Sequence, residues 1–339
     1  MTKEKILGAL YGAAVGDALG APTELRNTRQ IIEHFGGYVK EYQEAPNDTF
    51  AREYPAGTIT DDFSMSYYLM QAILQHQGMF NEKIAKEAII AWGNDGYYFD
   101  KFAGPTTRTA IEKMRLDLPT DVDPFGLINY SGLATNGGAM KTIPLAVLAK
   151  GNKKRALEYT IAMCQSTHFN SNAISAAAAI CCGATEALTN EATLKTIIEA
   201  ALWGALEGRK YGEEQQHISV GPDIEYKIRK AVYIGRQSKD FADLLQNTAD
   251  KVGTNFWVQE SIPAVFSLLA GTKGQTMSGI YAAVNVGGDT DTIASMLGGI
   301  TGGLNGIDSI PKRYIRKMEQ ANPKLSIQKV IHDFTALCL

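Results

Sequence analysis

The chain has 339 residues, of which 45% are hydrophobic and 20% are charged, a balance typical of a globular protein that buries a sizeable core. Its 33 basic and 36 acidic residues leave a formal net charge of -3, which argues against the broad basic surface that nucleic acids and anionic membranes require. No stretch reaches about 18 consecutive apolar residues, so we expect no membrane-spanning helix.

The N-terminal segment combines Lys3 and Lys5 with an apolar run over residues 6–15, which is a feature of secretory signal peptides. Asp17 closely follows the run, and glycine recurs at every fourth position, at Gly8, Gly12, Gly16 and Gly20. We therefore expect this segment to remain as a helix and the protein to be cytoplasmic. The four-residue spacing places these glycines on one helical face, where another backbone can approach closely.

Helical periodicity dominates the rest of the chain, and the alternation typical of β-strands is nearly absent. Helices are predicted near residues 3–19, 62–77, 82–94, 137–150, 153–166, 171–189, 193–209, 239–249, 257–270, 274–285, 289–305 and 325–338. We find no βαβ rhythm, fixed-period repeat or low-complexity linker. The sequence thus predicts an all-α protein with a single domain over residues 1–339.

Glycine is also frequent in the last third of the chain, where Gly298, Gly302 and Gly306 repeat the four-residue spacing. Each glycine inside a helix costs about 0.5–1 kcal/mol relative to alanine, so this number of glycines needs a compensating reason. Close helix crossing in a packed centre is the simplest explanation, and room for a ligand beside the helices is compatible with it.

The four cysteines do not have the spacing of a metal ribbon. Cys164, Cys181, Cys182 and Cys338 form no CxxC pair, and two of them are adjacent in an alanine-rich apolar run. We predict buried free thiols rather than a zinc site or a disulfide framework.

Two acidic turns carry the clearest chemical signal. Thr60-Asp61-Asp62 opens a predicted helix, and taken alone it is best explained as an N-cap with carboxylates at the positive end of the helix dipole. Residues 287–292, with the sequence Gly-Gly-Asp-Thr-Asp-Thr, open another helix with two carboxylates and a threonine. Two such starts are more than capping requires.

Clustered carboxylates repel one another unless a cation lies among them or some become protonated. Oxygen ligands without histidine or cysteine at ligand spacing favour Mg²⁺, Mn²⁺ or Ca²⁺ over Zn²⁺. The turn at Asp289 is not an EF-hand, since it lacks the glycine at position six and the bidentate glutamate at position twelve. We therefore predict a one- or two-ion site between the two helix starts, on the hypothesis that the chain brings them together.

Five motifs in this order resemble the ADP-ribosylglycohydrolase family. They are Gly16-Asp17-Ala18-Leu19-Gly20 followed by Glu24, Thr60-Asp61-Asp62 followed by Ser64-Met65, Asn136-Gly137-Gly138-Ala139-Met140, Thr167-His168, and Asn285 followed by residues 287–293. The resemblance implies a many-helix domain with a central cleft that holds two Mg²⁺ ions, or Mn²⁺ in some members. One departure is Lys141, which stands where arginine is common.

The resemblance also implies site residues. The expected metal ligands are Thr60, Asp61, Asp62, Asp289, Asp291 and Thr292, with Glu24 as a further acidic residue near the ions. Asn136, Gly137 and Gly138 resemble the loop that holds the diphosphate, His168 resembles the histidine beside ADP-ribose, and Gly104 is expected in the same cleft. Taken without the resemblance, the Asn136 motif is more typical of a loop-to-helix junction, and His168 of a structural or surface histidine.

The implied activity is hydrolysis of the glycosidic bond between ADP-ribose and an acceptor, which is a protein arginine or serine side chain or a small conjugate. Such cleavage passes through an oxocarbenium-like state, in which cations orient and activate water while a carboxylate transfers the proton. Asp62 and Glu24 are both candidates for that proton transfer. The alternatives are a non-catalytic ADP-ribose-binding protein of the same fold and a two-metal phosphoesterase.

Overall fold

The computed structural model describes residues 1–116, 118 and 134–339, and within them the only regular elements are helices. The α-helices are α1 (Lys3–Gly20), α2 (Thr28–Phe35), α3 (Asp61–Gln75), α4 (Glu82–Gly93), α5 (Gly96–Phe102), α6 (Pro105–Arg115), α7 (Ile143–Leu148), α8 (Lys153–Cys164), α9 (Ser171–Ala187), α10 (Leu194–Glu214), α11 (Ile224–Gln237), α12 (Phe241–Lys251), α13 (Val258–Gly271), α14 (Thr276–Asn285), α15 (Thr290–Asn305), α16 (Lys312–Ala321) and α17 (Ile327–Cys338). Short 3₁₀ turns are η2 (Asn136–Gly138) and η3 (Ile307–Ser309). The predicted all-α class is confirmed.

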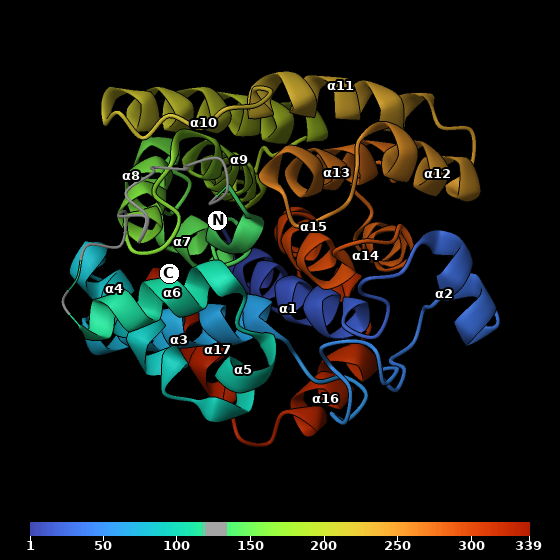
Figure 1. The fold of residues 1–339 in the computed structure, drawn as a ribbon, viewed down its shortest axis with the longest axis horizontal. Helices are drawn as coiled ribbons and strands as arrows, with labels where there is room; N and C mark the ends of the chain where they lie inside the picture. The colour runs from blue at the N-terminus through green and yellow to red at the C-terminus, as the bar shows by residue number, and fades with distance from the viewer. Residues whose placement is uncertain (117, 119–133) are drawn as a thin grey trace.

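Helices α1 and α15 form the centre of the molecule, with α9, α10, α11 and α13 on one side and α3, α4, α5 and α17 on the other (Figure 1). The glycine face of α1 lies directly on α15. A Cβ atom at Gly16 would come within 2.5 Å of the Ala294 carbonyl carbon, and one at Gly20 within 2.5 Å of the Asp291 Cα. The close helix crossing predicted from the glycine spacing is therefore confirmed, and it places the end of α1 against the start of α15.

The predicted helix over residues 137–150 is wrong. The segment instead contains η2, an irregular stretch and the short helix α7. Gly137 and Gly138 have low helix propensity, and the ring of Pro144 in the first turn of α7 favours a new helix start there.

Several helices were not predicted, and the most regular of them is α11. Its buried residues follow helical spacing, at Ile224, Ile228, Ala231, Val232 and Gly235. Helices α2, α5, α6 and α16 were also missed, and they have 7 to 11 residues each. Such short helices depend on tertiary packing more than on their own sequence.

Two further expectations concern the apolar segments. All four cysteines are buried and free, as predicted. Among the described residues, no helix combines the length and hydropathy that crossing a membrane would need.

Candidate active site

The N-termini of α3 and α15 meet. Thr60 is the N-cap of α3, and Asp289 is the N-cap of α15. The hydroxyl of Thr292, in the first turn of α15, donates to Oδ2 of Asp62, 230 positions earlier in the chain, at 3.1 Å. The two acidic turns, each predicted as a helix start, therefore face each other across one gap.

Backbone pairing brings Glu24 to the same place. The segment after α1 runs beside the turn before α15, where Leu25 N–H donates to the Gly288 carbonyl at 2.9 Å and Gly288 N–H donates to the Arg26 carbonyl at 2.8 Å. Gly287 has φ +88° and Gly288 has φ +77°, in the left-handed region that favours glycine. A Cβ at Gly287 would also meet the Arg26 carbonyl oxygen at 2.6 Å, so both glycines are required for this pairing.

The carboxylates form two triads that share Asp291. Ligand oxygens of Asp17, Asp62 and Asp291 lie within 4.8 Å of one another, and so do those of Glu24, Asp289 and Asp291. Oδ1 of Asp62 is buried and has no hydrogen-bond partner among the described residues. Because an unpartnered buried carboxylate oxygen is costly, and because every acidic group here offers oxygen, the site fits a hard divalent cation.

Burial and mutual repulsion raise the pKa values of these carboxyls. Burial is the main cause, and it raises the pKa of Asp17 and of Asp61 to about 7. Burial followed by the charge of Asp289 raises the pKa of Glu24, and burial followed by the charge of Glu24 raises that of Asp291. Burial and then the charge of Asp17 raise the pKa of Asp62. Without a cation, the cluster therefore retains protons near neutral pH.

This electrostatic arrangement predicts a pH-dependent effect of Mg²⁺. Raised carboxyl pKa values stabilise the folded protein at low pH, and that stability is lost as the pH rises through about 7, the value for Asp17 and Asp61. A cation replaces the protons, so the increase in melting temperature on adding Mg²⁺ is expected to be small near about pH 5 and to grow toward about pH 8. Differential scanning fluorimetry with MgCl₂, against NaCl of equal ionic strength, measures this. An increase that is largest at acidic pH would contradict it.

Asp17 is a site residue that the sequence reasoning missed. Its carboxylate accepts hydrogen bonds from Thr60 N–H at 3.0 Å, from the Thr60 hydroxyl at 2.8 Å and from Phe63 N–H at 3.0 Å. It thus holds the first turn of α3 in place while lying within one of the two triads. The available signal was an acidic residue on the buried, glycine-rich helix α1, where a charge needs partners.

Replacing Asp17 with asparagine is expected to weaken Mn²⁺ binding by about tenfold or more. An asparagine amide offers one acceptor oxygen and one donor nitrogen, so it cannot satisfy all the donors of Thr60 and Phe63. Isothermal titration with Mn²⁺ measures the effect, with Asp250→Asn on the exposed end of α12 as the matched control. Equal affinity in wild type and Asp17→Asn would show that Asp17 neither binds the ion nor orients its ligands.

The loop at Asn136 borders the acidic cluster. The Asn136 side-chain amide donates to Oδ2 of Asp289 at 2.5 Å, and its backbone N–H donates to the Phe256 carbonyl at 2.9 Å. Gly137 and Gly138 rest on His168, since a Cβ at Gly137 would lie 2.9 Å from the His168 ring and one at Gly138 would lie 3.3 Å from the His168 Cβ. The structure therefore brings the predicted loop and the predicted histidine together.

His168 is buried, and both of its ring nitrogens have partners. They are hydrogen-bonded to the hydroxyls of Thr135 at 3.0 Å and Thr167 at 2.7 Å. Burial followed by the charge of Lys141 lowers the pKa of His168, so the ring is neutral at physiological pH. These contacts make His168 a support for Gly137, and its role beside a substrate stays a prediction.

Gly104 is the N-cap of α6 and is half-buried. A Cβ there would meet nothing within 4 Å, so the space in front of it is open. The start of α6 borders the loop through Thr107, whose hydroxyl would lie 3.9 Å from a Cβ at Gly137. The structure thus places the neighbourhood of Gly104 beside the loop, and a contact of Gly104 with substrate stays a prediction.

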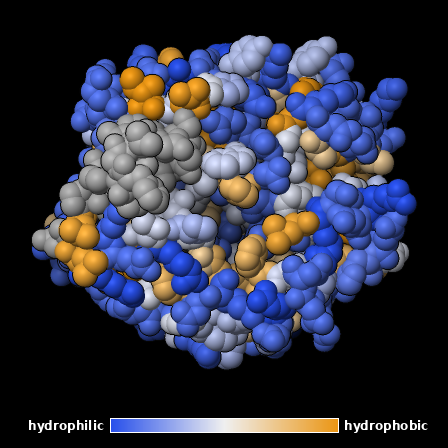
Figure 2. Space-filling view, in the orientation of Figure 1, coloured by the Kyte–Doolittle hydropathy of each residue, from blue (hydrophilic) through white to orange (hydrophobic). Residues whose placement is uncertain are grey.

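Two exposed aromatic residues that the sequence reasoning did not select lie beside this loop. Phe256 is 49% exposed and Trp257 is 37% exposed, with their ring centroids 4.9 Å apart. Thr135 and Trp257 form an isolated bridge, so these residues are fixed to the Asn136 loop. The face of the molecule in Figure 2 is hollowed near its centre, where Figure 1 shows α1 and α15.

Comparison with known proteins identifies relatives along the whole chain. The family model described as ADP-ribosylglycohydrolase matches residues 1–338. The protein YegU of Escherichia coli (strain K12) is 26% identical over 330 residues, which cover 95% of this chain and 94% of YegU. The ADP-ribosyl-[dinitrogen reductase] glycohydrolase of Rhodospirillum rubrum is 25% identical over 316 residues, covering 93% and 90%. A solved structure titled ADP-ribosylglycohydrolase-related protein complex has a TM-score of 0.71, with 22% identity and 99% coverage of both chains, and it shows the same fold.

Proposed function

The chain belongs to the ADP-ribosylglycohydrolase family, and we propose that it is a Mg²⁺-dependent hydrolase that cleaves the glycosidic bond between ADP-ribose and an acceptor. Membership of this family makes the protein a glycosyl hydrolase that acts on ADP-ribosyl groups. The proposed dependence on a metal ion is supported by one observation, the pair of carboxylate triads that share Asp291 where the N-termini of α3 and α15 meet.

In this proposal, the metal ligands are Thr60, Asp61, Asp62, Asp289, Asp291 and Thr292. Two Mg²⁺ ions, or Mn²⁺, would supply positive charge that orients the ribose hydroxyls and lowers the pKa of a reacting water. Asp17 and the threonine hydroxyls keep the carboxylates in place before any ion binds. The Asn136 side chain, which donates to Asp289, links this centre to the loop proposed to hold the diphosphate.

Glu24 is the better of the two candidates for proton transfer at the glycosidic bond. It is half-buried, whereas Asp62 is buried and its Oδ2 already accepts from the Thr292 hydroxyl at 3.1 Å. A group that gives a proton to a leaving group must reach that group directly or through one water. Glu24 is the more exposed of the two carboxyls, and its raised pKa allows it to hold a proton.

The acceptor is proposed to be a protein side chain, arginine or serine, or a small ADP-ribose conjugate. The Rhodospirillum rubrum relative is named for ADP-ribosyl removal from a protein, which supports the first option. The exposed pair Phe256 and Trp257 beside the loop offers apolar surface for a substrate group larger than ribose. A cytoplasmic location and one domain over residues 1–339 remain parts of the proposal.

The experiment is an incubation of the purified protein with ADP-ribosylated arginine and serine peptides and with a small ADP-ribose conjugate, in Mg²⁺ or in EDTA. We expect free ADP-ribose from at least one substrate in Mg²⁺ and none in EDTA. Release that EDTA does not affect would refute the metal mechanism. Tight ADP-ribose binding without turnover would instead support the non-catalytic alternative, and release of AMP or phosphate would support a phosphoesterase.

A further inference from the structure

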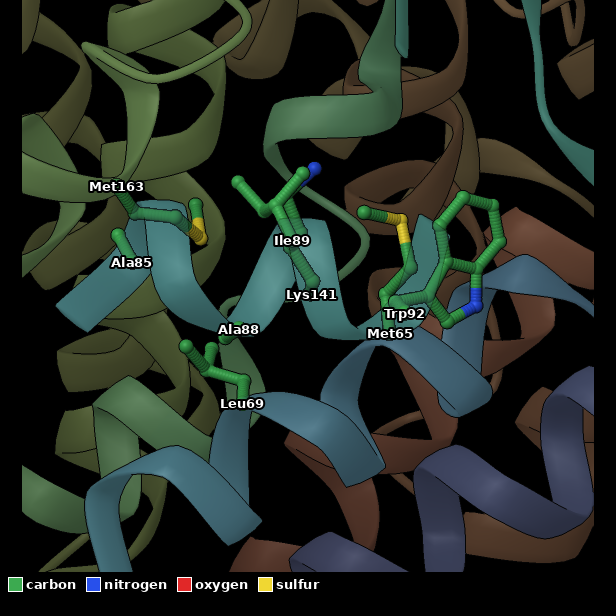
Figure 3. A pocket seen from close by; sticks show the side chains of 8 residues that line it. All are labelled: Met65, Leu69, Ala85, Ala88, Ile89, Trp92, Lys141 and Met163. Atoms are coloured by element: carbon green, nitrogen blue, oxygen red, sulfur yellow. The ribbon is translucent and has the colours of Figure 1, made fainter. Parts of the chain in front are cut away.

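Lys141 is a buried lysine that the proposed chemistry leaves without a role. It is 2% exposed, although lysine is almost never fully buried unless it has a partner. Its side chain lines a small pocket between α3 and α4, shown in Figure 3. The other residues of the pocket are Met65, Leu69, Ala85, Ala88, Ile89, Trp92 and Met163, all of them apolar or aromatic.

The ammonium group of Lys141 turns back to the loop that precedes it. It donates a hydrogen bond to the Gly137 carbonyl, four residues earlier. The apolar pocket surrounds the aliphatic part of the side chain, so the charged end is directed to the loop rather than to solvent. Gly137 therefore lies against both the Lys141 ammonium group and the His168 ring.

The positive charge of Lys141 also acts on the acidic cluster. Its pKa is lowered to about 8, chiefly by burial, while the charges of Asp61 and Asp62 act in the opposite direction. These two aspartates belong to the proposed metal ligands, so the ammonium group acts on the same region as the cations. A positive charge at that position attracts anionic ligands and repels divalent cations.

We propose that Lys141 is a positioning residue that fixes the Gly137 loop for an anionic diphosphate. This inference rests on the proposed function, since it assigns the diphosphate as the ligand of the loop. Two different results are expected for the two ligands. Removal of the charge should weaken binding of a diphosphate ligand, but it should not weaken binding of the metal ion.

The experiment measures two affinities by isothermal titration calorimetry at about pH 7, where Lys141 is charged, for Mn²⁺ alone and for ADP-ribose in saturating Mg²⁺. The variants are Lys141→Met, which suits the apolar pocket, Lys141→Gln, which keeps a donor without the charge, and Lys141→Arg, which keeps the charge. Lys154→Met on the exposed start of α8 is the matched control. Melting temperatures verify that each variant is folded.

We expect Lys141→Met to lose about tenfold or more in ADP-ribose affinity and to bind Mn²⁺ as tightly as wild type or more tightly. Lys141→Gln should show the same signs with a smaller loss of ADP-ribose affinity, and Lys141→Arg should stay within about threefold of wild type. A parallel loss of both affinities would mean that Lys141 only maintains the fold. Unchanged ADP-ribose affinity in both uncharged variants would also overturn the proposal.

The two levels of inference can fail separately. If wild type binds no ADP-ribose and releases none, the proposed function and the assigned diphosphate ligand are both wrong. If wild type hydrolyses substrate but the Lys141 variants match it in ADP-ribose affinity, only the role of Lys141 is wrong. The Mn²⁺ titration separates the role at the loop from a structural one in either case, because weaker Mn²⁺ binding in Lys141→Gln would mean that Lys141 only maintains the fold.

Discussion

Replacing Asp291 with asparagine is expected to lower turnover by about 10³-fold or more, while the metal-free protein melts at the same temperature as wild type or at a higher one. Asp291 is the only described residue in both carboxylate triads, so its loss removes a ligand from each proposed ion. Burial and then the charge of Glu24 raise the pKa of Asp291, which means that its ionised form opposes folding at neutral pH. Asparagine removes that cost together with the ligand.

Two measurements test this prediction on the same samples. Release of ADP-ribose from the substrate found active with wild type gives turnover, and fluorimetry with and without Mg²⁺ gives the melting temperatures. The control is Asp308→Asn, which makes the same chemical change at an exposed position. If Asp291→Asn kept more than about a tenth of the wild-type turnover, Asp291 would not be a shared metal ligand.

Replacing Gly298 with alanine is expected to destabilise the protein by about 3 kcal/mol, even though alanine has the higher helix propensity. Gly298 lies on the face of α15 that meets α1. A Cβ there would overlap the backbone of Gly12, with the Gly12 carbonyl carbon at 2.8 Å. Backbone atoms inside a central helix pair cannot move away cheaply, so the two helices must separate.

Gly303, five residues later in the same helix, provides the matched control. A Cβ at Gly303 would meet the Cβ of Ala9 at 3.4 Å and a methyl group of Leu188 at 3.5 Å, which are ordinary contacts. Gly303→Ala is therefore expected to be neutral or to stabilise by up to about 1 kcal/mol. Urea denaturation measures the free energy of unfolding of both variants, and we expect the same dependence on urea concentration for each. Equal stability of the two would contradict the account of the central crossing.

The Gly298 variant should also lose activity beyond its loss of stability, because the crossing determines where the site lies. Gly20, at the end of α1, lies against Asp291, and Asp17 shares a triad with that residue. Separation of α1 from α15 would move the two halves of the cluster apart. Turnover measured well below the unfolding transition, where the variant is folded, should therefore be reduced relative to Gly303→Ala.

Much of this arrangement could be predicted from the sequence because its signals are local. A threonine and paired aspartates at a helix start, or glycine at every fourth position, are visible in any short window. The glycine spacing even predicted the close crossing of α1 that brings the acidic turns together. That these turns face each other was a hypothesis until the hydrogen bond between Thr292 and Asp62 appeared in the structure.

The missed features depend on contacts between distant segments. Asp17 looks like an interruption of an apolar helix, and only the fold shows that it accepts hydrogen bonds from Thr60 and Phe63. In the sequence, Lys141 is only a lysine at a position where the family commonly has arginine. Its hydrogen bond to the Gly137 carbonyl and its apolar pocket depend on the packing of α3 and α4. The helix predicted over 137–150 failed for a local reason instead, since Gly137 and Gly138 have low helix propensity and Pro144 favours a new helix start.

The central claim is that the two acidic turns hold divalent cations between them, and crystals soaked in Mn²⁺ test it most directly. Anomalous diffraction at the manganese edge locates the ions independently of activity. We expect density between the N-termini of α3 and α15, within coordination distance of Asp62, Asp289 and Asp291. Manganese density found only elsewhere, at a Mn²⁺ concentration that supports full activity, would contradict the account.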